Sequence, residues 1–365
     1  FPKNYDFEIP KTIWKIRSSK SKRVALQFPE GLLVYSCAIS SVLQKYTGCE
    51  TVIMGDVTYG ACCIDDYTAR TLGCTLLVHY GHSCLVPIQD MEEIDVLYVF
   101  VNIDINLSHF VDTFKANFDI SKKVALVTTI QFVVSLQAVK KELSSLGYSI
   151  EIPQCKPLSP GEILGCTSPK VSEDVTSLIF LGDGRFHLES VAIRNPTVKI
   201  YQYNPYSKKL THEEFAYDEL VRNRITSIEK AKKAKKFGLI QGTLGRQGNR
   251  NVFEVLENKL TSHGKEFIRV LLSEITPQKL ALFEDVECWV QVACPRISLD
   301  WGNAFSVPLL TPYELMVVLD EAKFISHSYP MDNYAYDSAG PWTNNHPKNR
   351  STPVQRRKHV IIAST

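Results

Sequence analysis

The sequence predicts an α/β protein built from three pseudo-repeated small domains, each with a parallel sheet. Three segments begin alike, with a short apolar strand followed by a helical pattern and a second strand. Their first strands start at Arg23, Lys123 and Phe237, so the repeats lie about 100–115 residues apart. A further apolar strand follows in each segment. Strand, helix and strand in succession indicate parallel pairing with right-handed crossovers, so three such units predict three small α/β domains.

The elements follow the same order in each repeat. In the first, the strand Arg23–Phe28 precedes a helical stretch that opens at "PEGLL", and "TVIMGD" and "TLLVHYGHSC" are later strands. In the second, Lys123–Thr128 precedes a helix that ends on Gly147, and "YSIEIP" and "TSLIFLGDGRFH" follow. In the third, Phe237–Gln241 precedes a helix that ends on Gly264, and "KEFIRVLL" and "ECWVQVACPR" follow. Glycine at both helix ends is typical of a C-cap.

These repeats predict domains at residues 1–120, 121–228 and 229–327, followed by an extended tail at residues 328–365. The tail is rich in proline, asparagine, glycine and aromatic residues. We therefore expect it to wrap a surface or to be partly disordered, and not to form a fourth domain.

Composition places the chain among ordinary soluble globular proteins. Hydrophobic residues make up 44% and charged residues 22%, and the formal net charge is +2. This charge gives no reason to expect direct nucleic-acid binding or capture by a membrane surface. No apolar run approaches the roughly 18–20 residues of a membrane span, and no signal peptide is visible. Ten cysteines are too sparse for a disulfide scaffold. We expect a reduced, cytoplasmic protein, and the absence of any CxxC pair disfavours a zinc ribbon.

Three cysteines follow strands in three different repeats, namely Cys62 in "YGAC", Cys166 in "GEILGC" and Cys294 in "VQVACPR". Ligands gather at the carboxyl ends of parallel strands. If three such ends face one axis, the three thiols can meet and hold a [4Fe–4S] cluster that leaves one iron open to a small molecule. Taken singly, each thiol is better explained as a small buried hydrophobe. Cys63 and Cys84 are the alternatives, and Cys62 is preferred because it completes a Gly-Ala-Cys turn.

Other strand-end loops carry side chains suited to binding a cofactor or substrate. The candidates are Gln27, Glu30, His82, Asp183, Arg185, Gly242, Gly245, Arg246, Gly248 and Asp300. The glycine-rich loop at residues 242–248 resembles an anion cradle, in which backbone N–H groups bind a carboxylate or phosphate. It lacks the GxGxxG and Walker spacings, so nucleotide binding by those modes is disfavoured. Turn chemistry explains each of these loops about as well as function does.

Several long strings then resemble a known family. They are "GDVTYGACCIDDYTARTLGCTLLVHYGHSCLVP", "GDGRFHLES", "QGTLGRQGN", "ACPRISLDWG", "YPMDNYA" and "GPWTNNH". Together they resemble the cluster-bearing subunits of the 2-(3-amino-3-carboxypropyl)histidine synthase family, in the eukaryotic form. The resemblance covers nearly the whole chain. It implies three similar α/β domains arranged in a triangle around a central site, each giving one ligand to a [4Fe–4S] cluster. The matching motif positions are Cys62, Cys166 and Cys294.

The resemblance also implies a reaction and its partners. A 3-amino-3-carboxypropyl radical from S-adenosylmethionine would add to C2 of a histidine in elongation factor 2, the first step of diphthamide synthesis. The cluster supplies the electron, and no catalytic residue beyond its ligands is implied. The family further implies a heterodimer with a homologous second subunit, and an external electron donor protein. Our interpretation is that the 242–248 amides and Arg246 hold the amino-carboxypropyl end of the substrate.

Three other interpretations compete with this one. Quinolinate synthase shares a plan of three repeated domains around a three-cysteine cluster, but uses the open iron as a Lewis acid. The chain could also be a non-catalytic or electron-relay subunit of the same heterodimer. An ordinary nucleotide-binding or glycosyl-transfer α/β protein is the last alternative, but it leaves the three thiols unexplained.

Overall fold

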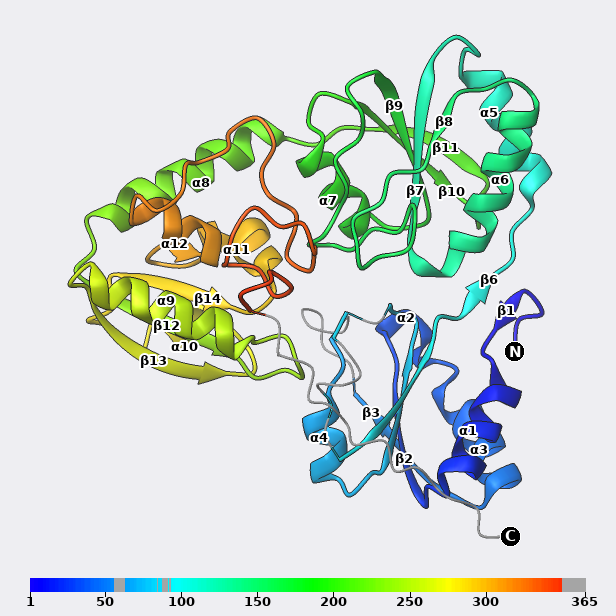
Figure 1. The fold of residues 1–365 in the computed structure, drawn as a ribbon, viewed down its shortest axis with the longest axis horizontal. Coiled ribbons are helices and arrows are strands. Elements are labelled where there is room, and N and C mark those ends of the chain that lie inside the picture. Colours follow the sequence, from blue (N-terminus) through cyan, green and yellow to red (C-terminus); the bar gives the residue numbers. More distant parts are fainter. Residues whose placement is uncertain (56–62, 84, 87–90, 92, 350–365) are drawn as a thin grey trace, which may run out of the picture.

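The computed structural model describes residues 1–55, 63–83, 85–86, 91 and 93–349. Its sheets lie in three separate lobes around a common centre (Figure 1). A short antiparallel pair, β1 (Tyr5–Asp6) with β6 (Asn102–Ile103), connects the N-terminus to the chain between the first and second lobes. Among the described residues, no helix has the length and apolar character needed to cross a membrane. The predicted α/β class is confirmed, with a fully parallel sheet in the first and third lobes and one antiparallel edge pair in the second.

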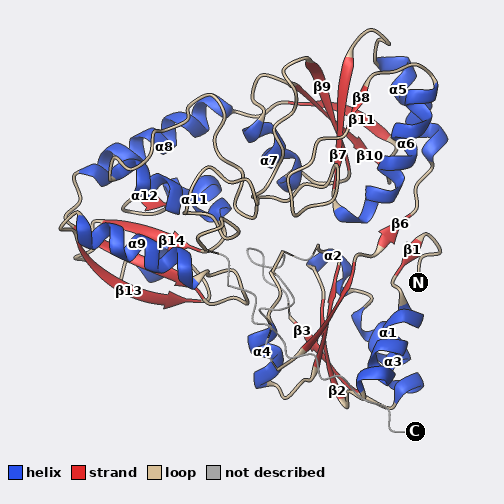
Figure 2. Ribbon diagram, in the orientation of Figure 1, coloured by secondary structure: helices blue, strands red, loops and turns tan. Residues whose placement is uncertain are grey.

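The first lobe has a fully parallel sheet covered by helices on both faces (Figure 2). Its strand order is β3 (Glu50–Met54), β2 (Arg23–Gln27), β4 (Leu76–Tyr80) and β5 (Asp95–Val99). Its helices are α1 (Ile9–Ser19), α2 (Glu30–Leu33), α3 (Ser36–Thr47) and α4 (Asp66–Thr71). The single helix predicted to open at "PEGLL" is therefore two helices, α2 and α3. Helix α2, which follows β2 directly, faces the centre of the molecule (Figure 1).

The second lobe has a mixed sheet. Its strand order is β11 (Lys209–Glu213), β10 (Lys199–Asn204), β9 (Val175–Leu181), β7 (Lys123–Thr128) and β8 (Ile150–Glu151). Only the edge pair β10 and β11 is antiparallel, a hairpin that the repeat pattern did not predict. The helices are α5 (Leu107–Asn117), α6 (Val133–Ser145) and α7 (Phe186–Arg194). Helix α5 falls in the range predicted for the first domain, yet Phe110 and Phe114 pack in the core of this lobe.

The third lobe again has a parallel sheet. Its strand order is β13 (Glu266–Leu272), β12 (Lys236–Gly242), β14 (Cys288–Val292) and β15 (Leu309–Leu310). The helices are α8 (Tyr217–Lys232), α9 (Arg250–Ser262), α10 (Pro277–Leu280), α11 (Pro295–Trp301) and α12 (Pro312–Val318). Helix α8 starts within the range predicted for the second domain, but Leu220 and Ile228 pack in the core of the third lobe.

The chain after α12 runs between the lobes, where Figure 1 draws it in orange and red. We call residues 328–349 the tail segment. Met331 and Tyr334 are almost fully buried, and Asn349 is 2% exposed, so this part of the predicted tail is ordered and packed inside the molecule. Residues 350–365 lie outside the described part of the chain.

Candidate functional site

Cys166 lies in a tight turn of the second lobe. An isolated antiparallel bridge joins Leu164 and Thr167, and the Leu164 amide donates to the Thr167 carbonyl at 2.9 Å. Cys166 lies between them in the sequence and is 5% exposed. The turn thus presents a buried thiol whose backbone is fixed on both sides.

Cys294 lies two residues after strand β14 and is the N-cap of helix α11. Its residue is 8% exposed, and its carbonyl accepts a hydrogen bond of 3.0 Å from Gln291 Nε2. Pro295 at the first helical position favours a helix start at this point. The backbone that carries this thiol is therefore held by the strand, the helix and a buried amide.

Arg296 joins the Cys294 helix to the second lobe. Its Nη1 donates to the carbonyls of Gly165 at 3.2 Å and Phe186 at 2.7 Å. Its Nη2 bonds Glu189 at 2.7 Å, and its Nε bonds Asp300 at 2.7 Å. Gly165 immediately precedes Cys166, so one guanidinium connects the backbone beside one predicted ligand to the helix that begins with another.

The charge of Arg296 is buried and paired. The residue is 1% exposed, and its guanidinium lies 4.4 Å from the centre of the Phe186 ring. Burial opposes this charge, but Asp300 and Glu189 raise the pKa of Arg296 above its usual value. The result is a permanent cation between the turn of Cys166 and the helix of Cys294, where it can offset negative charge from thiolates.

The first lobe contributes Cys63 to the same region. Cys62, its predicted ligand, lies outside the described residues, as does the alternative Cys84. Cys63 is 1% exposed and packs in one apolar cluster with residues of the second lobe and the tail segment. We call this the junction cluster, and its members are Cys63, Leu85, Leu158, Leu164, Cys166 and Tyr334. Cys63, the neighbour of the predicted ligand Cys62, therefore shares an apolar cluster with the predicted ligand Cys166.

Gln27 holds the turn after Cys63 to the end of β2. Its Nε2 donates to the Cys63 carbonyl at 3.1 Å, and its Oε1 accepts from the Asp65 amide at 3.1 Å. The same Oε1 lies 2.9 Å from His79 Nδ1, so that nitrogen carries the proton and Nε2 of His79 can only accept a hydrogen bond. Gln27 thus has a structural role in placing this loop, and its role in binding a cofactor stays a prediction.

Three imidazoles lie near this junction and are held in the neutral form. Burial is the main cause in each case, and it lowers the pKa of His79 well below its usual value. Burial likewise lowers the pKa of His82 and of His187 to about 4. Neither Nε2 of His79 nor Nδ1 of His82 has a hydrogen-bond partner among the described residues. The predicted site residue His82 is thus a partly buried, uncharged group.

The glycine-rich loop of the third lobe packs against the first lobe. Gly245 has φ +52°, and a Cβ there would lie 2.5 Å from the Ile64 carbonyl oxygen. A Cβ on Gly248 would lie 2.1 Å from the Gly242 carbonyl oxygen. These two glycines are therefore required by close backbone approach. Their role as an anion cradle stays a prediction.

Arg246 makes the electrostatic contact of the same junction. Its Nε and Nη2 each bond one oxygen of Asp66 at 2.7 Å, and its guanidinium lies 4.2 Å from the centre of the Tyr67 ring. The Arg246 amide also donates to the Ile64 carbonyl at 3.0 Å. Arg246 therefore clamps the third lobe to helix α4 of the first, and direct contact with a substrate stays a prediction.

The remaining candidates lie in different surroundings. Asp300 pairs with Arg296, as described above. Arg185 bonds Glu213 at 2.6 Å on the surface of the second lobe. Asp183 and Glu30 are exposed. The structure thus brings Asp300 to the Cys294 region, and leaves Glu30, Asp183 and Arg185 with exposed side chains.

A cavity of about 570 Å³ lies beside Cys294 in the third lobe. It is formed where strands β12, β13 and β14 end, which is the usual ligand position in a parallel sheet. Its lining includes Gly242, Leu272, Ala293, Ile297 and Trp301. The predicted site residue Gly242 therefore lines a cavity that also touches the residue before Cys294.

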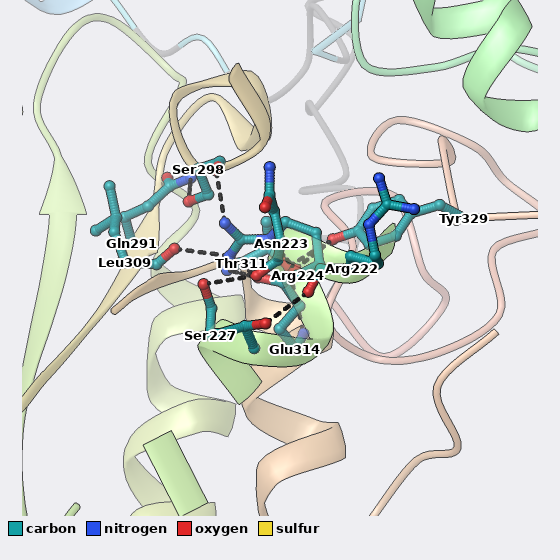
Figure 3. Close-up of polar contacts among 11 residues, drawn as sticks. Arg222, Asn223, Arg224, Ser227, Gln291, Ser298, Leu309, Thr311, Glu314 and Tyr329 are labelled. Atoms are coloured by element: carbon teal, nitrogen blue, oxygen red, sulfur yellow. Dashed lines mark hydrogen bonds and ion pairs between the residues drawn. The ribbon is translucent and has the colours of Figure 1, made fainter. Parts of the chain in front are cut away.

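A buried ion pair, Arg224 with Glu314, is bonded to Ser298 of helix α11 (Figure 3). Arg224 of α8 donates Nε and Nη2 to the two carboxylate oxygens of Glu314, at 2.6 and 2.7 Å. Their side chains are 1% and 0% exposed. Arg224 Nη1 donates to the Ser298 carbonyl of α11 at 2.8 Å, and Tyr329 of the tail segment donates to Glu314 at 3.1 Å.

This pair is connected to Cys294 by further hydrogen bonds. Gln291 Nε2 donates both to Ser298 Oγ and to the Cys294 carbonyl, at 3.0 Å each. No sequence pattern marked Arg224, Glu314, Tyr334 or Arg296 as a site residue. The "CPR" motif is the only local signal for any of them, because their partners are remote in the sequence.

The donor chemistry suits an iron–sulfur cluster. Cys166 and Cys294 are buried thiols in fixed turns, and Arg296 supplies a nearby buried cation. Soft thiolate ligands select such clusters, and nearby positive charge offsets theirs. Within the part of the chain that the structure describes, no three or more His, Cys, Asp and Glu side chains are placed to hold a metal ion. The third predicted ligand, Cys62, lies outside that part.

Comparisons with known proteins agree with this arrangement. A family model of diphthamide synthesis proteins matches residues 28–330. The chain is 60% identical over 366 residues to 2-(3-amino-3-carboxypropyl)histidine synthase subunit 1 of Caenorhabditis elegans, covering 99% of this chain and 92% of that protein. It is 54% identical over 350 residues to the human protein of the same name, covering 96% of this chain and 80% of that protein.

A solved structure gives the corresponding likeness in three dimensions. Dph2 from Pyrococcus horikoshii, described with a 4Fe-4S cluster, superposes with a TM-score of 0.73 at 27% identity. The match covers 89% of this chain and 94% of that one. The chain therefore belongs to the diphthamide synthesis protein family.

Proposed function

We propose that this chain is the cluster-bearing catalytic subunit of a 2-(3-amino-3-carboxypropyl)histidine synthase. It would transfer the 3-amino-3-carboxypropyl group of S-adenosylmethionine to C2 of a histidine in elongation factor 2. One observation carries the proposal. Arg296 joins the Cys294 helix to the carbonyl before Cys166, while Cys63, the neighbour of Cys62, packs in the same apolar cluster as Cys166.

The proposed cluster ligands are Cys62, Cys166 and Cys294. A bound, reduced [4Fe–4S] cluster would supply the single electron that breaks the bond from sulfur to the γ-carbon of S-adenosylmethionine, leaving methylthioadenosine and a radical that adds to C2 of the imidazole. Loss of the C2 proton and return of one electron would then restore the aromatic ring. The protein's part is to hold the ligand turns, to exclude water and to orient the substrate. The burial of Cys166 and Cys294 and the bonds of Arg296 and Gln291 support this part.

The third-lobe cavity is the proposed place for S-adenosylmethionine. It touches Ala293, next to Cys294, and its volume of about 570 Å³ suits a drug-sized ligand. Its apolar wall of Leu272, Ile297 and Trp301 would shield the reacting bond from water. We place the amino-carboxypropyl end toward the 242–248 amides, since Arg246 already gives two N–H groups to Asp66.

Three partners belong to this proposal. The name "subunit 1" in its relatives supports a heterodimer with a homologous second subunit. Elongation factor 2 is the protein substrate, and an external protein supplies electrons. We place the reaction in the cytoplasm, where cysteines stay reduced. No catalytic residue beyond the cluster ligands is proposed.

The test uses the heterodimer purified without oxygen. We expect about four irons and four sulfides per heterodimer, a paramagnetic signal after reduction, and methylthioadenosine formed from S-adenosylmethionine. Cys62→Ala, Cys166→Ala and Cys294→Ala should each lower bound iron strongly. The exposed Cys37 and the buried Cys49 supply matched Cys→Ala controls that keep the iron.

The outcomes separate the competing functions. A colourless, iron-free heterodimer ends the proposal. If a cluster survives all three ligand substitutions, other residues must be its ligands. A cluster in this chain with no methylthioadenosine would make it an electron-relay or structural subunit, and quinolinate as the product would make it a dehydratase.

A further inference from the structure

The tail segment is attached to the Cys166 turn by its backbone. An antiparallel bridge joins Asp332 to Thr167, and the Ser168 amide donates to the Met331 carbonyl at 2.8 Å. The Asn333 amide donates to the Cys166 carbonyl at 3.3 Å. Residues 331–333 therefore act as a short strand added to the turn that carries a predicted ligand.

Tyr334 carries this attachment to the first lobe. Its amide donates to Thr167 Oγ1 at 3.0 Å, while its phenol oxygen lies 2.6 Å from Cys63 Sγ. Tyr334 is 3% exposed and Cys63 is 1% exposed. A buried phenol and a buried thiol each need a polar partner, and here each is a partner of the other.

The tail segment is also fixed to the third lobe. Asn345 Nδ2 donates to the Tyr334 carbonyl at 2.7 Å, and the Asn344 amide donates to the Asn333 carbonyl at 3.0 Å. The α9 N-cap residue Asn249 donates to the Asn344 carbonyl at 3.4 Å. The second and third lobes therefore set the position of Tyr334. Its phenol in turn contacts Cys63 of the first lobe.

We propose that Tyr334 is a positioning residue of the cluster site. Its phenol holds the Cys63 thiol in a hydrogen bond and so keeps that thiol from binding the cluster. The same bond fixes the first lobe against the Cys166 turn. This inference rests on the proposed function for its link to a cluster, but the contact between phenol and thiol does not. It assigns a role to Cys63 and to the tail segment, neither of which the proposed chemistry requires.

The first experiment uses full-length protein from which the cluster has been removed under reducing conditions. Tyr334→Phe keeps the ring and removes only the hydroxyl, so the thiol loses a buried hydrogen bond. We expect a small maleimide to alkylate Cys63 about tenfold faster, measured by mass spectrometry of its peptide. The exposed Cys37 is the internal reference, and Tyr46→Phe, at an exposed site, is the matched control. An unchanged rate overturns the contact.

The second experiment uses the anaerobic heterodimer with its cluster. We expect Tyr334→Phe to give a second paramagnetic species after reduction, because the released Cys63 competes as a ligand. Adding Cys63→Ala should restore a single species, a rescue that a loss of folding would not show. A single, unchanged spectrum in Tyr334→Phe overturns the exclusion of Cys63. An iron-free wild type would refute the proposed function, while the alkylation result would still decide the contact.

Discussion

At Arg296, one side chain decides how two predicted ligand regions meet. The guanidinium reaches the carbonyls of Gly165 and Phe186 and the carboxylate of Glu189, all on the second lobe. The sequence places Arg296 in a strand-end loop with Asp300, which is its i+4 partner on α11. Its other partners lie more than 100 residues away, so no local pattern could predict them.

Replacing Arg296 by lysine should loosen the site while keeping the charge. Lysine cannot span three acceptors in a fork, so buried carbonyls lose their donors. We expect a loss of about 2–4 kcal/mol in unfolding free energy and faster release of iron to a chelator. Denaturant melts and iron release in the anaerobic heterodimer measure the two effects. Arg250→Lys is the control, since Arg250 is exposed and pairs only with Glu254 in the described structure. Equal behaviour of the two variants would contradict this role.

Two partly buried imidazoles, His82 and His187, predict a pH dependence of stability. His82 and His187 have a folded pKa of about 4, below the usual 6.5, because burial disfavours the charged ring. The unfolded chain therefore binds more protons between pH 6.5 and 4, and stability falls as pH falls through that window. Cluster-free protein should show a falling melting temperature there. His82→Gln together with His187→Gln should flatten the slope, and an unchanged slope would place its origin elsewhere.

Among the elements, strands and helix ends follow the sequence closely. Strand β7 occupies the predicted Lys123–Thr128, and β12 extends the predicted third-lobe strand by one residue at each end. Gly147 and Gly264 take φ +92° and +63°, as C-terminal glycines do. The packing partners of α5 and α8 could not be predicted, because amphipathic patterns show that a face is buried and not which sheet covers it.

Two asparagine N-caps provide an element-scale test. Asn106 caps α5 by accepting from the His109 amide. Asn249 caps α9 by accepting from the Asn251 and Val252 amides, and also donates to Asn344 of the tail segment. Alanine at either site should cost about 1 kcal/mol in unfolding free energy. Only Asn249→Ala should speed proteolytic cleavage within residues 328–349, and equal cleavage in both variants would refute the tail contact.

For the whole molecule, contacts between lobes define the candidate site. Arg296 links the second and third lobes, Arg246 links the first and third, and the junction cluster links the first and second. The repeat pattern predicted three lobes, while the meeting of the three strand-end cysteines stays a prediction. The contacts between lobes rest on pairs such as Asp66 with Arg246, 180 residues apart, which periodicity does not show.

Alanine substitutions at Gly245 and Gly264 can distinguish the loss of a contact between lobes from backbone strain alone. Both have positive φ, but a Cβ on Gly264 meets no atom within 4 Å, whereas one on Gly245 would meet the Ile64 carbonyl. Gly264→Ala should cost about 1 kcal/mol. Gly245→Ala should cost more and should also weaken iron retention, because the first and third lobes must separate. Thermal melts and iron analysis compare them, and equal losses would argue against this junction.

The attachment of residues 331–334 to the Cys166 turn has a consequence for biogenesis. All three lobes precede this strand in the chain, so a nascent polypeptide can fold its sheets before that turn acquires its extra strand. Until then, Cys63 lacks its phenol partner. Iron and sulfide delivered after residues 331–334 are in place would therefore meet a Cys63 thiol that is already bonded to Tyr334 and separate from the proposed ligands.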